Sequence, residues 1–482
     1  MLKKITLLTL LTLAIGSTAF SQSSGPWTLE QCIEYARKNS ITVKSALNTV
    51  ELAQINDLGN RMQRLPSVNG NASGGYQFGR TINPATNSFI AESIATTSFS
   101  ISGGVTLYNG NIINNSIEQG RINLQAANLD ALAAANDISL QVAGAYLNIL
   151  LAEEQLANAQ KQVAQSTKQL EQTDKLINAG SLPVNDRLDF VAQLALDQQA
   201  VIEARNSVKI NYLLLKQLLE LDPTVELTIV RPEITVPTDA DPEAIDVEQV
   251  YTTALGTQPQ IEAGELRLQS ALLDEKIAKG NILPSLRLSG SLSTNFSNRF
   301  QDFNAPINQR TEFGTPFTVI VNDMPVSVQF PETRNDGYQD IPFTDQLSQN
   351  FGQSIFLSLS VPIYNNHVNR VNMQRARINM ENTELNNRQI KQNLKSDVQR
   401  SIADAQAARE SYQASQRSVE AAQAAFDNAQ KRFDLGAINS LEYTTATNNL
   451  DRAKVNLIQA KYQYLFNLKV VDFYLGREIQ ID

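Results

Sequence analysis

The chain has 482 residues with one His, one Cys and one Trp, and its 49 acidic and 40 basic side chains give a formal net charge of -9. A single cysteine cannot form an internal disulfide or one of the zinc or iron-sulfur sites that need several thiolates. The acidic balance argues against a nucleic-acid partner, because binding to phosphates requires a basic surface.

The first 21 residues predict a secretory signal peptide. Lys3 and Lys4 precede a short apolar stretch, and small residues follow at Ala19 and Ser21. A cationic start, an apolar core and a small-residue exit are typical of a segment that is removed on export. We therefore expect residues 1–21 to be cleaved and the mature chain to leave the cytoplasm.

The remaining sequence contains an internal repeat, which decides the domain organisation. The motif Leu-Pro-Ser at Leu65 recurs at Leu283, and Gly180 recurs as Gly436 with a larger separation, so the second copy contains extra residues. Several prolines mark a linker between the copies. The predicted organisation is a first repeat at 22–221, a linker at 222–246, and a second repeat at 247–482 whose enlarged loop spans about 297–350.

Each copy is predicted to contain one helix, two strands and two long helices, in that order. The first helices, about 29–64 and 247–282, are expected to end before prolines. Strand alternation follows at 68–78 and again at 286–292. In the partner strand of the first copy, one face carries Phe99, Ile101, Gly103, Val105 and Leu107. Strands of about ten residues can cross a bilayer at a tilt, although a half-buried soluble sheet shows the same alternation.

The long helices carry a seven-residue repeat of apolar positions, which is typical of coiled-coil packing. One position of the repeat is small throughout the first copy, at Ala145, Ala152, Ala159, Ser166 and Thr173. Gly180 and Gly436 are expected to reverse the chain between an outward and a return helix. An outward helix of about 70 residues would be roughly 100 Å long.

Four bilayer-length strands cannot span a membrane alone, because an open sheet leaves unpaired backbone groups in hydrocarbon. Two, three or four copies would supply the eight or more strands of a viable barrel. The fold class is therefore an α+β membrane protein. Its long helices are expected to project together from one rim of the barrel and to enclose a hollow helical cylinder.

In their order and duplication, these motifs resemble the TolC-type outer-membrane efflux proteins of Gram-negative bacteria. The resemblance covers essentially the whole mature chain and includes the Tyr-Asn turns at Tyr108 and Tyr364 and the segment from Arg432 to Gly436. It implies a homotrimer with a 12-stranded barrel in outer-membrane lipid and a long periplasmic α-helical barrel. It also implies docking to a periplasmic adaptor, or membrane fusion protein, and to an inner-membrane pump.

The resemblance also implies a periplasmic gate at the helical hairpin tips. Asp186 and Glu442, each six residues after its glycine, match acidic gate positions of the family. The alternative to a gate role, for both residues, is that the negative charge stabilises the start of a helix. A further family acid is replaced by Thr445, and a gate-locking aromatic position is Phe433, so an apolar constriction near Phe433 is expected in place of an ionic lock.

We expect no catalytic, cofactor or metal site, because His367 is the only histidine and no phosphate-binding or zinc-protease motif occurs. The predicted function is a passive channel for substrates that an inner-membrane pump delivers. One alternative is the outer-membrane component of type I protein secretion. Another is a periplasmic coiled-coil adaptor or structural protein, although a chain of that kind would not need two strand pairs.

Overall fold

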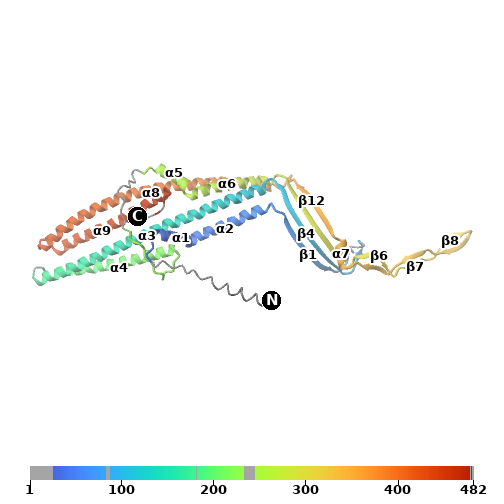
Figure 1. Ribbon diagram of the computed structural model, residues 1–482, viewed down its shortest axis with the longest axis horizontal. Coiled ribbons are helices and arrows are strands. Elements are labelled where there is room, and N and C mark those ends of the chain that lie inside the picture. Colours follow the sequence, from blue (N-terminus) through green and yellow to red (C-terminus); the bar gives the residue numbers. More distant parts are fainter. Residues whose placement is uncertain (1–24, 83–86, 181, 233–244, 478, 480–482) are drawn as a thin grey trace, which may run out of the picture. The chain divides into compact units, whose positions relative to one another are not determined.

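The computed structural model describes residues 25–82, 87–180, 182–232, 245–477 and 479. The predicted signal peptide, and residues 233–244 of the predicted linker, lie outside the described residues. The chain divides into two compact units. One comprises the chain up to Ile55 with Arg121–Ser270 and the chain from Glu381, and the other comprises Asn56–Gly120 and Ala271–Met380. Each unit thus contains parts of both repeats (Figure 1).

The first helical segment of each repeat is two helices, so the prediction of one continuous helix was wrong. The four helices are α1 (Leu29–Asn39), α2 (Ile41–Met62), α5 (Val247–Thr257) and α6 (Pro259–Gly280). The backbone leaves the helical region at Ser40, with ψ of 132°, and at Gln258, with ψ of 115°. Pro259 then opens α6, where its missing N–H needs no partner and its fixed φ suits a helix start.

The long helices agree with the prediction. The outward helices α3 (Ile112–Asn178) and α8 (Val368–Asp434) have 67 residues each, and the return helices are α4 (Asp186–Leu218) and α9 (Ser440–Tyr474). Gly180 and Gly436 have φ of 74° and 67°, the left-handed conformation that glycine adopts without steric cost. Each glycine therefore ends an outward helix at the predicted reversal.

Two of the apolar clusters in the first unit are built around its long helices. One surrounds Val142 and Ile149 of α3 and Leu215 of α4, and the other surrounds Val398 of α8, all of them fully buried. Cys32 of α1 lies in the first cluster, where burial, followed by the charge of Glu30, raises the pKa of its thiol to about 12. The cysteine is therefore a packed core residue.

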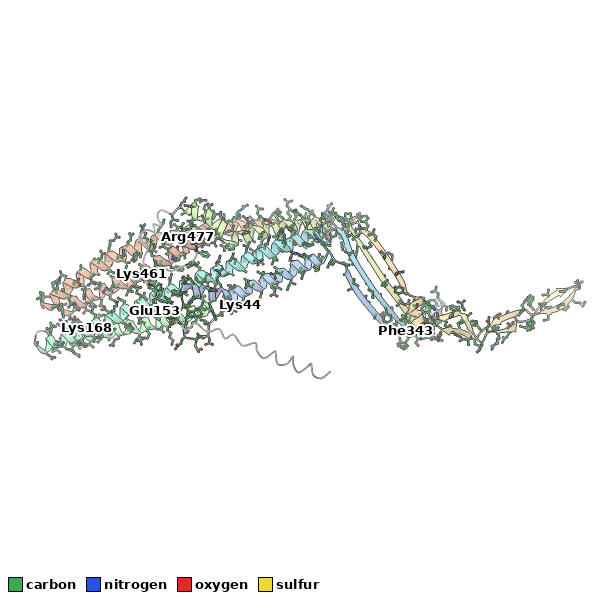
Figure 2. All side chains as sticks on the ribbon, in the orientation of Figure 1. Lys44, Glu153, Lys168, Phe343, Lys461 and Arg477 are labelled. Atoms are coloured by element: carbon green, nitrogen blue, oxygen red, sulfur yellow. The ribbon has the colours of Figure 1, made fainter. Side chains whose placement is uncertain are left out.

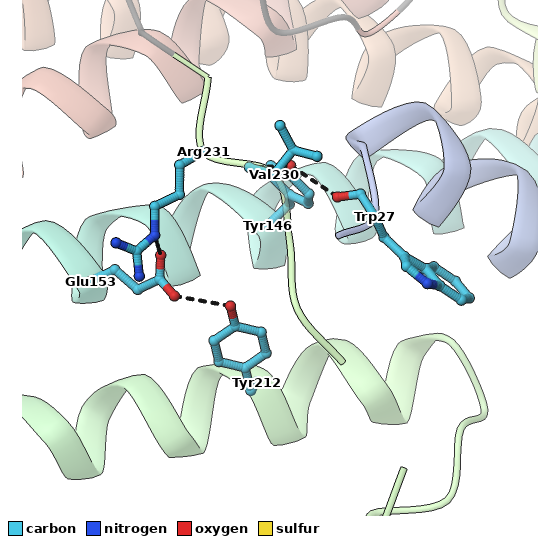
Figure 3. A network of polar contacts seen from close by, with 6 residues as sticks. All are labelled: Trp27, Tyr146, Glu153, Tyr212, Val230 and Arg231. Carbon is cyan, nitrogen blue, oxygen red and sulfur yellow. Dashed lines mark hydrogen bonds and ion pairs between the residues drawn. The ribbon is translucent and has the colours of Figure 1, made fainter. Parts of the chain in front are cut away.

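A short segment after α4 pairs with the chain before α1 in the same unit (Figure 3). Trp27 and Ile229 form a parallel bridge, and the Tyr146 hydroxyl of α3 donates a hydrogen bond of 2.6 Å to the Val230 carbonyl. Ile229 is buried, with 6% of its surface exposed. The beginning of the predicted linker is thus part of the packed structure.

An ion pair closes this region of the first unit (Figure 3). Arg231 Nε lies 2.5 Å from Glu153 Oε2, and the Tyr212 hydroxyl donates to Glu153 Oε1 over 2.9 Å. Burial, together with the hydrogen bond to Glu153, raises the pKa of Tyr212 to about 12. Tyr212 therefore stays protonated as a donor at neutral pH.

The second unit contains a four-stranded antiparallel sheet in the order β1-β4-β5-β12. Its strands are β1 (Ser67–Gln77), β4 (Ile94–Asn109), β5 (Ser285–Ser297) and β12 (Gly352–Ser360). Each repeat contributes one hairpin, and β4 of the first repeat pairs with β5 of the second. Among the described strands, β1 and β12 are the outer strands of this sheet, and each is paired along one side only.

The two faces of the sheet differ in polarity. One face carries apolar side chains, among them Ile101, Leu292 and Ile355, and the other carries rows of serine. Ser73 is hydrogen-bonded to Ser98 over 2.7 Å and Ser291 to Ser354 over 2.8 Å. The predicted alternation is confirmed as far as Val105, but a bulge between Thr106 and Tyr108 places Tyr108, not Leu107, opposite Leu286.

The enlarged loop of the second repeat is itself a long hairpin. Three successive strand pairs build it, β6 (Gln301–Ile307) with β11 (Gly337–Asp340), β7 (Arg310–Phe313) with β10 (Pro331–Arg334), and β8 (Phe317–Val321) with β9 (Met324–Val328). At its base, the short helix α7 (Phe343–Gln349) packs on β5, where Phe343 lies 4.9 Å from Phe296 between ring centroids (Figure 2). The prolines and glycines of this segment do not prevent strand pairing.

Two further short strands, β2 (Thr81–Ile82) and β3 (Phe89–Ile90), pair with each other between β1 and β4. None of the helices in the described part of the chain is both long and apolar enough to cross a bilayer.

Candidate functional site at the helical hairpin tips

The tips of the two helical hairpins lie side by side in the first unit. The first tip joins α3 to α4 through residues 179–185, and the second joins α8 to α9 through residues 435–439. Asn439 caps α9, because its side-chain oxygen accepts a hydrogen bond of 2.9 Å from the Glu442 N–H. The cap fixes where the return helix begins and therefore which side chains face the neighbouring hairpin.

Three aromatic side chains join the two tips. Phe190 of α4, Phe433 of α8 and Tyr443 of α9 are 3%, 2% and 3% exposed. The ring centroids of Phe433 and Tyr443 are 5.0 Å apart in a stacked arrangement, and Phe190 meets Phe433 edge to face at 5.7 Å. Contacts of this kind contribute about 0.5–1.5 kcal/mol each beyond the apolar area they bury. We call these three residues the tip cluster.

Hydrogen bonds connect the starts of the two return helices. The Ser440 hydroxyl, 3% exposed, donates to Asp189 Oδ2 over 2.7 Å and lies 3.5 Å from Asp186 Oδ1. Asp186 is the first residue of α4 and half-buried. A serine of the second hairpin therefore contacts two carboxylates of the first. These contacts hold the starts of the two return helices beside each other.

Glu442 differs from Asp186 in its surroundings. Its side chain is exposed in the first turn of α9, and no hydrogen bond or ion pair joins its carboxylate to another residue in the described ranges. A negative charge in a first helical turn is favoured by the helix dipole. The exposed carboxylate of Glu442 is nevertheless accessible to ions from the surrounding solvent. The carboxylate of Asp186 is less accessible, because it is half-buried and contacts Ser440.

A polar seam continues away from the tip cluster along the two hairpins. The buried Asp197 of α4 accepts hydrogen bonds from Ser166 of α3 and, over 2.8 Å, from Gln193. Asn158 donates to Asp451 of α9 over 2.8 Å. Burial raises the pKa of Asp451 and the negative charge of Asp197 raises it further, while the hydrogen bond from Asn158 opposes the shift.

The seam also contains buried polar atoms without a hydrogen-bond partner, at Gln162 Nε2, Gln169 Nε2, Thr173 Oγ1 and Thr444 Oγ1. Each such atom lowers the stability of the packed arrangement, because its lost hydration is not replaced. The Tyr443 hydroxyl donates to Gln169 Oε1 over 3.2 Å, so these unsatisfied atoms begin directly beside the tip cluster.

The structure brings two of the three predicted site residues close to the contact between the hairpins. Phe433 lies within it and Asp186 at its edge, whereas Glu442 points away into solvent. Phe190 and Tyr443 were not predicted from the sequence. Comparing the repeats could not find them, because their equivalents in the other repeat are Ala446 and Arg187.

A second candidate site is the polar face of the sheet in the other unit. Arg287 is the only charged residue in β1, β4, β5 and β12, and it projects from this face near the start of β5. A β-carbon at Gly104 would lie 3.0 Å from an Arg287 guanidinium nitrogen, so glycine makes room for this side chain. The guanidinium is exposed and has no acidic partner among the described residues.

Paired strands inserted in duplicate between long helical hairpins are the fold of known outer-membrane channels. The CmeC outer membrane channel of Campylobacter jejuni matches with 17% identity over 93% of this chain and 85% of that chain, with a TM-score of 0.73. The outer membrane protein VceC of Vibrio cholerae matches with 15% identity over 94% and 96%, with a TM-score of 0.72. The MtrE outer membrane channel of Neisseria gonorrhoeae, solved in its open state, matches with 17% identity over 94% and 90%, with a TM-score of 0.68.

The sequence itself identifies the family. The model of the outer membrane efflux protein family matches residues 32–220 and 250–477, so this chain belongs to that family. A comparison with curated proteins finds no significant match. Membership assigns the chain to efflux across the outer membrane and confirms the resemblance that the repeated motifs indicated.

Proposed function

We propose that this chain is one protomer of a passive outer-membrane channel in which three copies close a barrel of 12 strands. The observation that carries the proposal is the sheet of the second unit, which has one apolar face, one polar face and two outer strands. A sheet in hydrocarbon must have no unpaired edge. Pairing of β12 in one copy with β1 in the next removes both edges in a closed ring, and the family resemblance favours three copies.

The position of Arg287 supports the orientation of the sheet in this barrel. An arginine on a lipid-facing strand surface costs about 2–4 kcal/mol at the bilayer midplane, and about 0–1 kcal/mol near the interfaces, where the start of β5 would lie. Arg287 projects from the serine-rich face, on the side opposite Ile101 and Leu292. The serine-rich face therefore lines the aqueous lumen in our proposal, and the apolar face contacts lipid.

The long helices form the periplasmic part of the proposed conduit. Three copies would supply six hairpins, which enclose a helical barrel below the membrane. Such a duct has no source of energy of its own, so we propose that an inner-membrane pump delivers the substrate and that a periplasmic adaptor connects the two. This arrangement supports efflux of small molecules as its primary use, with type I protein secretion as the related alternative.

We propose that the hairpin tips form the periplasmic gate. Phe433 acts through the tip cluster, because its buried side chain holds the second hairpin against the first and does not face a pore. Asp186 stabilises the same contact through Ser440. Glu442, whose carboxylate is exposed, would form a ring of three negative charges that attracts cations to the entrance.

Planar-bilayer recording of the purified protein tests the channel proposal. We expect discrete single-channel conductance with a preference for cations, since the gate carries exposed acids. Membranes that stay electrically silent at protein amounts that insert, as judged by co-sedimentation with liposomes, would contradict it. A periplasmic adaptor or structural protein would give that silent result.

A further inference from the structure

The long hairpin of the second unit combines two segments of different chemistry. Its stalk, residues 301–312 and 331–340, carries seven charged side chains, and Arg310 pairs with Glu312 over 2.6 Å. Its tip, residues 313–330, carries a single charge, Asp323, which lies in the turn. Asn322 and Asp323 both have positive φ, which is the turn that suits a two-residue hairpin.

One face of the tip is entirely apolar. The cross-strand partners are Phe317 with Val328, Val319 with Val326 and Val321 with Met324, so these six side chains share one face. We call them the apolar tip face. The other face carries Thr318, Ser327, Ile320 and Pro325. Phe330 stacks on Phe317 at one end of this face, with ring centroids 5.3 Å apart, whereas Met324 and Val321 near the turn are 67% and 50% exposed.

An isolated two-stranded hairpin with an uncovered apolar face is marginally stable in water. Uncharged, exposed strands of this kind also promote association, and natural proteins usually protect them with charges or a cover. The stalk has such charges, whereas the tip has none on its strands. The tip is therefore suited to being covered by another protein surface.

We propose that the apolar tip face packs against the same face of neighbouring copies in the trimer and forms an apolar cap on the extracellular side of the channel. The inference rests on the proposed trimer. Two observations favour another copy of this chain as the surface that covers the apolar tip face. The hairpin extends from β5 and β12, and β12 is the outer strand through which copies pair in the proposed trimer, so this trimer would gather the hairpins around one axis. The tip strands also carry no charge, so identical faces meet without repulsion.

Single cysteines in outer-membrane preparations test this packing. The native Cys32 is fully buried and serves as an unreactive background. Val326→Cys places a thiol on the apolar tip face, and Ser327→Cys, one residue further along β9, places a matched thiol on the opposite face. On mild oxidation we expect Val326→Cys to form disulfide-linked dimers inside unboiled trimers, at a yield independent of protein concentration, and Ser327→Cys to form several-fold fewer.

Equal cross-linking of the two variants, or none in either, in a protein that migrates as a trimer would overturn the inference and leave the proposed channel intact. Cross-linking of Val326→Cys to a different protein would also overturn it, in favour of a foreign partner. Loss of the trimer itself would instead contradict the proposed function.

Hydrogen exchange of the unmodified trimer provides a second readout that does not depend on cysteine chemistry. We expect slow exchange of backbone amides in residues 317–328, and at least tenfold faster exchange in the double variant Val319→Asp, Val326→Asp with the trimer preserved. Fast exchange already in the unmodified trimer would overturn the proposed packing.

Discussion

Arg287 is the residue whose environment can be tested most simply. It is the only charge on the four sheet strands, and we place it in the lumen near the helix-side end of the barrel. Three guanidinium groups in a narrow aqueous channel attract anions and repel cations. Arg287→Gln should therefore shift the reversal potential in a salt gradient towards greater cation preference, while Arg287→Lys should leave it near the wild-type value.

An unchanged reversal potential in Arg287→Gln, with normal single-channel conductance, would show that the serine-rich face does not line the pore. Insertion into bilayers controls for folding of both variants.

Glu442 lies at the helical hairpin tips and should have the opposite effect on ion selectivity. Its exposed carboxylate contributes to a negative ring in our proposal, so Glu442→Gln should weaken cation preference. Glu410→Gln, an exposed acid near the middle of α8, is the matched control and should change selectivity less. Identical behaviour of the two variants would leave Glu442 with the role of a helix-start charge alone.

At the scale of elements, the contact between the hairpins depends on the tip cluster. Phe190→Ala removes a buried aromatic ring, and such substitutions cost about 3–5 kcal/mol. Because the ring lies between two hairpins, most of the lost packing free energy should appear as easier separation of the hairpin tips. We expect larger single-channel conductance and faster proteolysis at the tips. Gln198→Ala, at an exposed polar position of the same helix, should change neither.

The stability of the packing along the polar seam should depend on pH through Asp451. Its raised pKa, caused by burial and by Asp197, means that the folded state favours the protonated form, against the effects of Asn158 and Lys454. The contribution of this group to stability is therefore full below its unfolded-state pKa and is lost as pH rises through the folded-state pKa. Asp451→Asn keeps an acceptor for Asn158 and should raise the thermal midpoint at pH 7 but not at about pH 3, below the unfolded value of ~3.9. An equal increase at both pH values would contradict the assignment.

The elements themselves were largely predictable from the sequence. Alternation and heptad periodicity are local patterns, so they located the four sheet strands and the 67-residue helices. The break at Gln258 was missed although Pro259 signals it, because apolar periodicity continues across it. The strand order of the loop hairpin was also missed, since its weak alternation is interrupted by prolines.

The contacts of the candidate site were much less predictable. Phe433 and Asp186 were found because they match gate positions of the family that the sequence resembles, but their partners Phe190 and Ser440 come from the other hairpin. Such contacts depend on how two helices rotate against each other, which a periodic sequence does not specify. The bulge at Leu107 has the same origin, because strand register depends on the neighbouring strand as well as on alternation.

At the scale of the whole molecule, each unit has a surface that a single copy of the chain leaves unpaired or uncovered. Each outer strand of the sheet in the second unit has one unpaired edge among the described residues, and the long hairpins of the first unit expose apolar side chains such as Leu188, Leu196 and Ile202. Both features are satisfied when copies associate around one axis. A single protomer is therefore not the functional unit in our account.

Native mass spectrometry of the detergent-extracted protein tests this central claim most directly, because it counts the copies that close the barrel. The account predicts one dominant species with the mass of three mature chains, which persists at protein concentrations low enough to dissociate weak complexes. A monomer, or a ladder of sizes that changes with dilution, would contradict it.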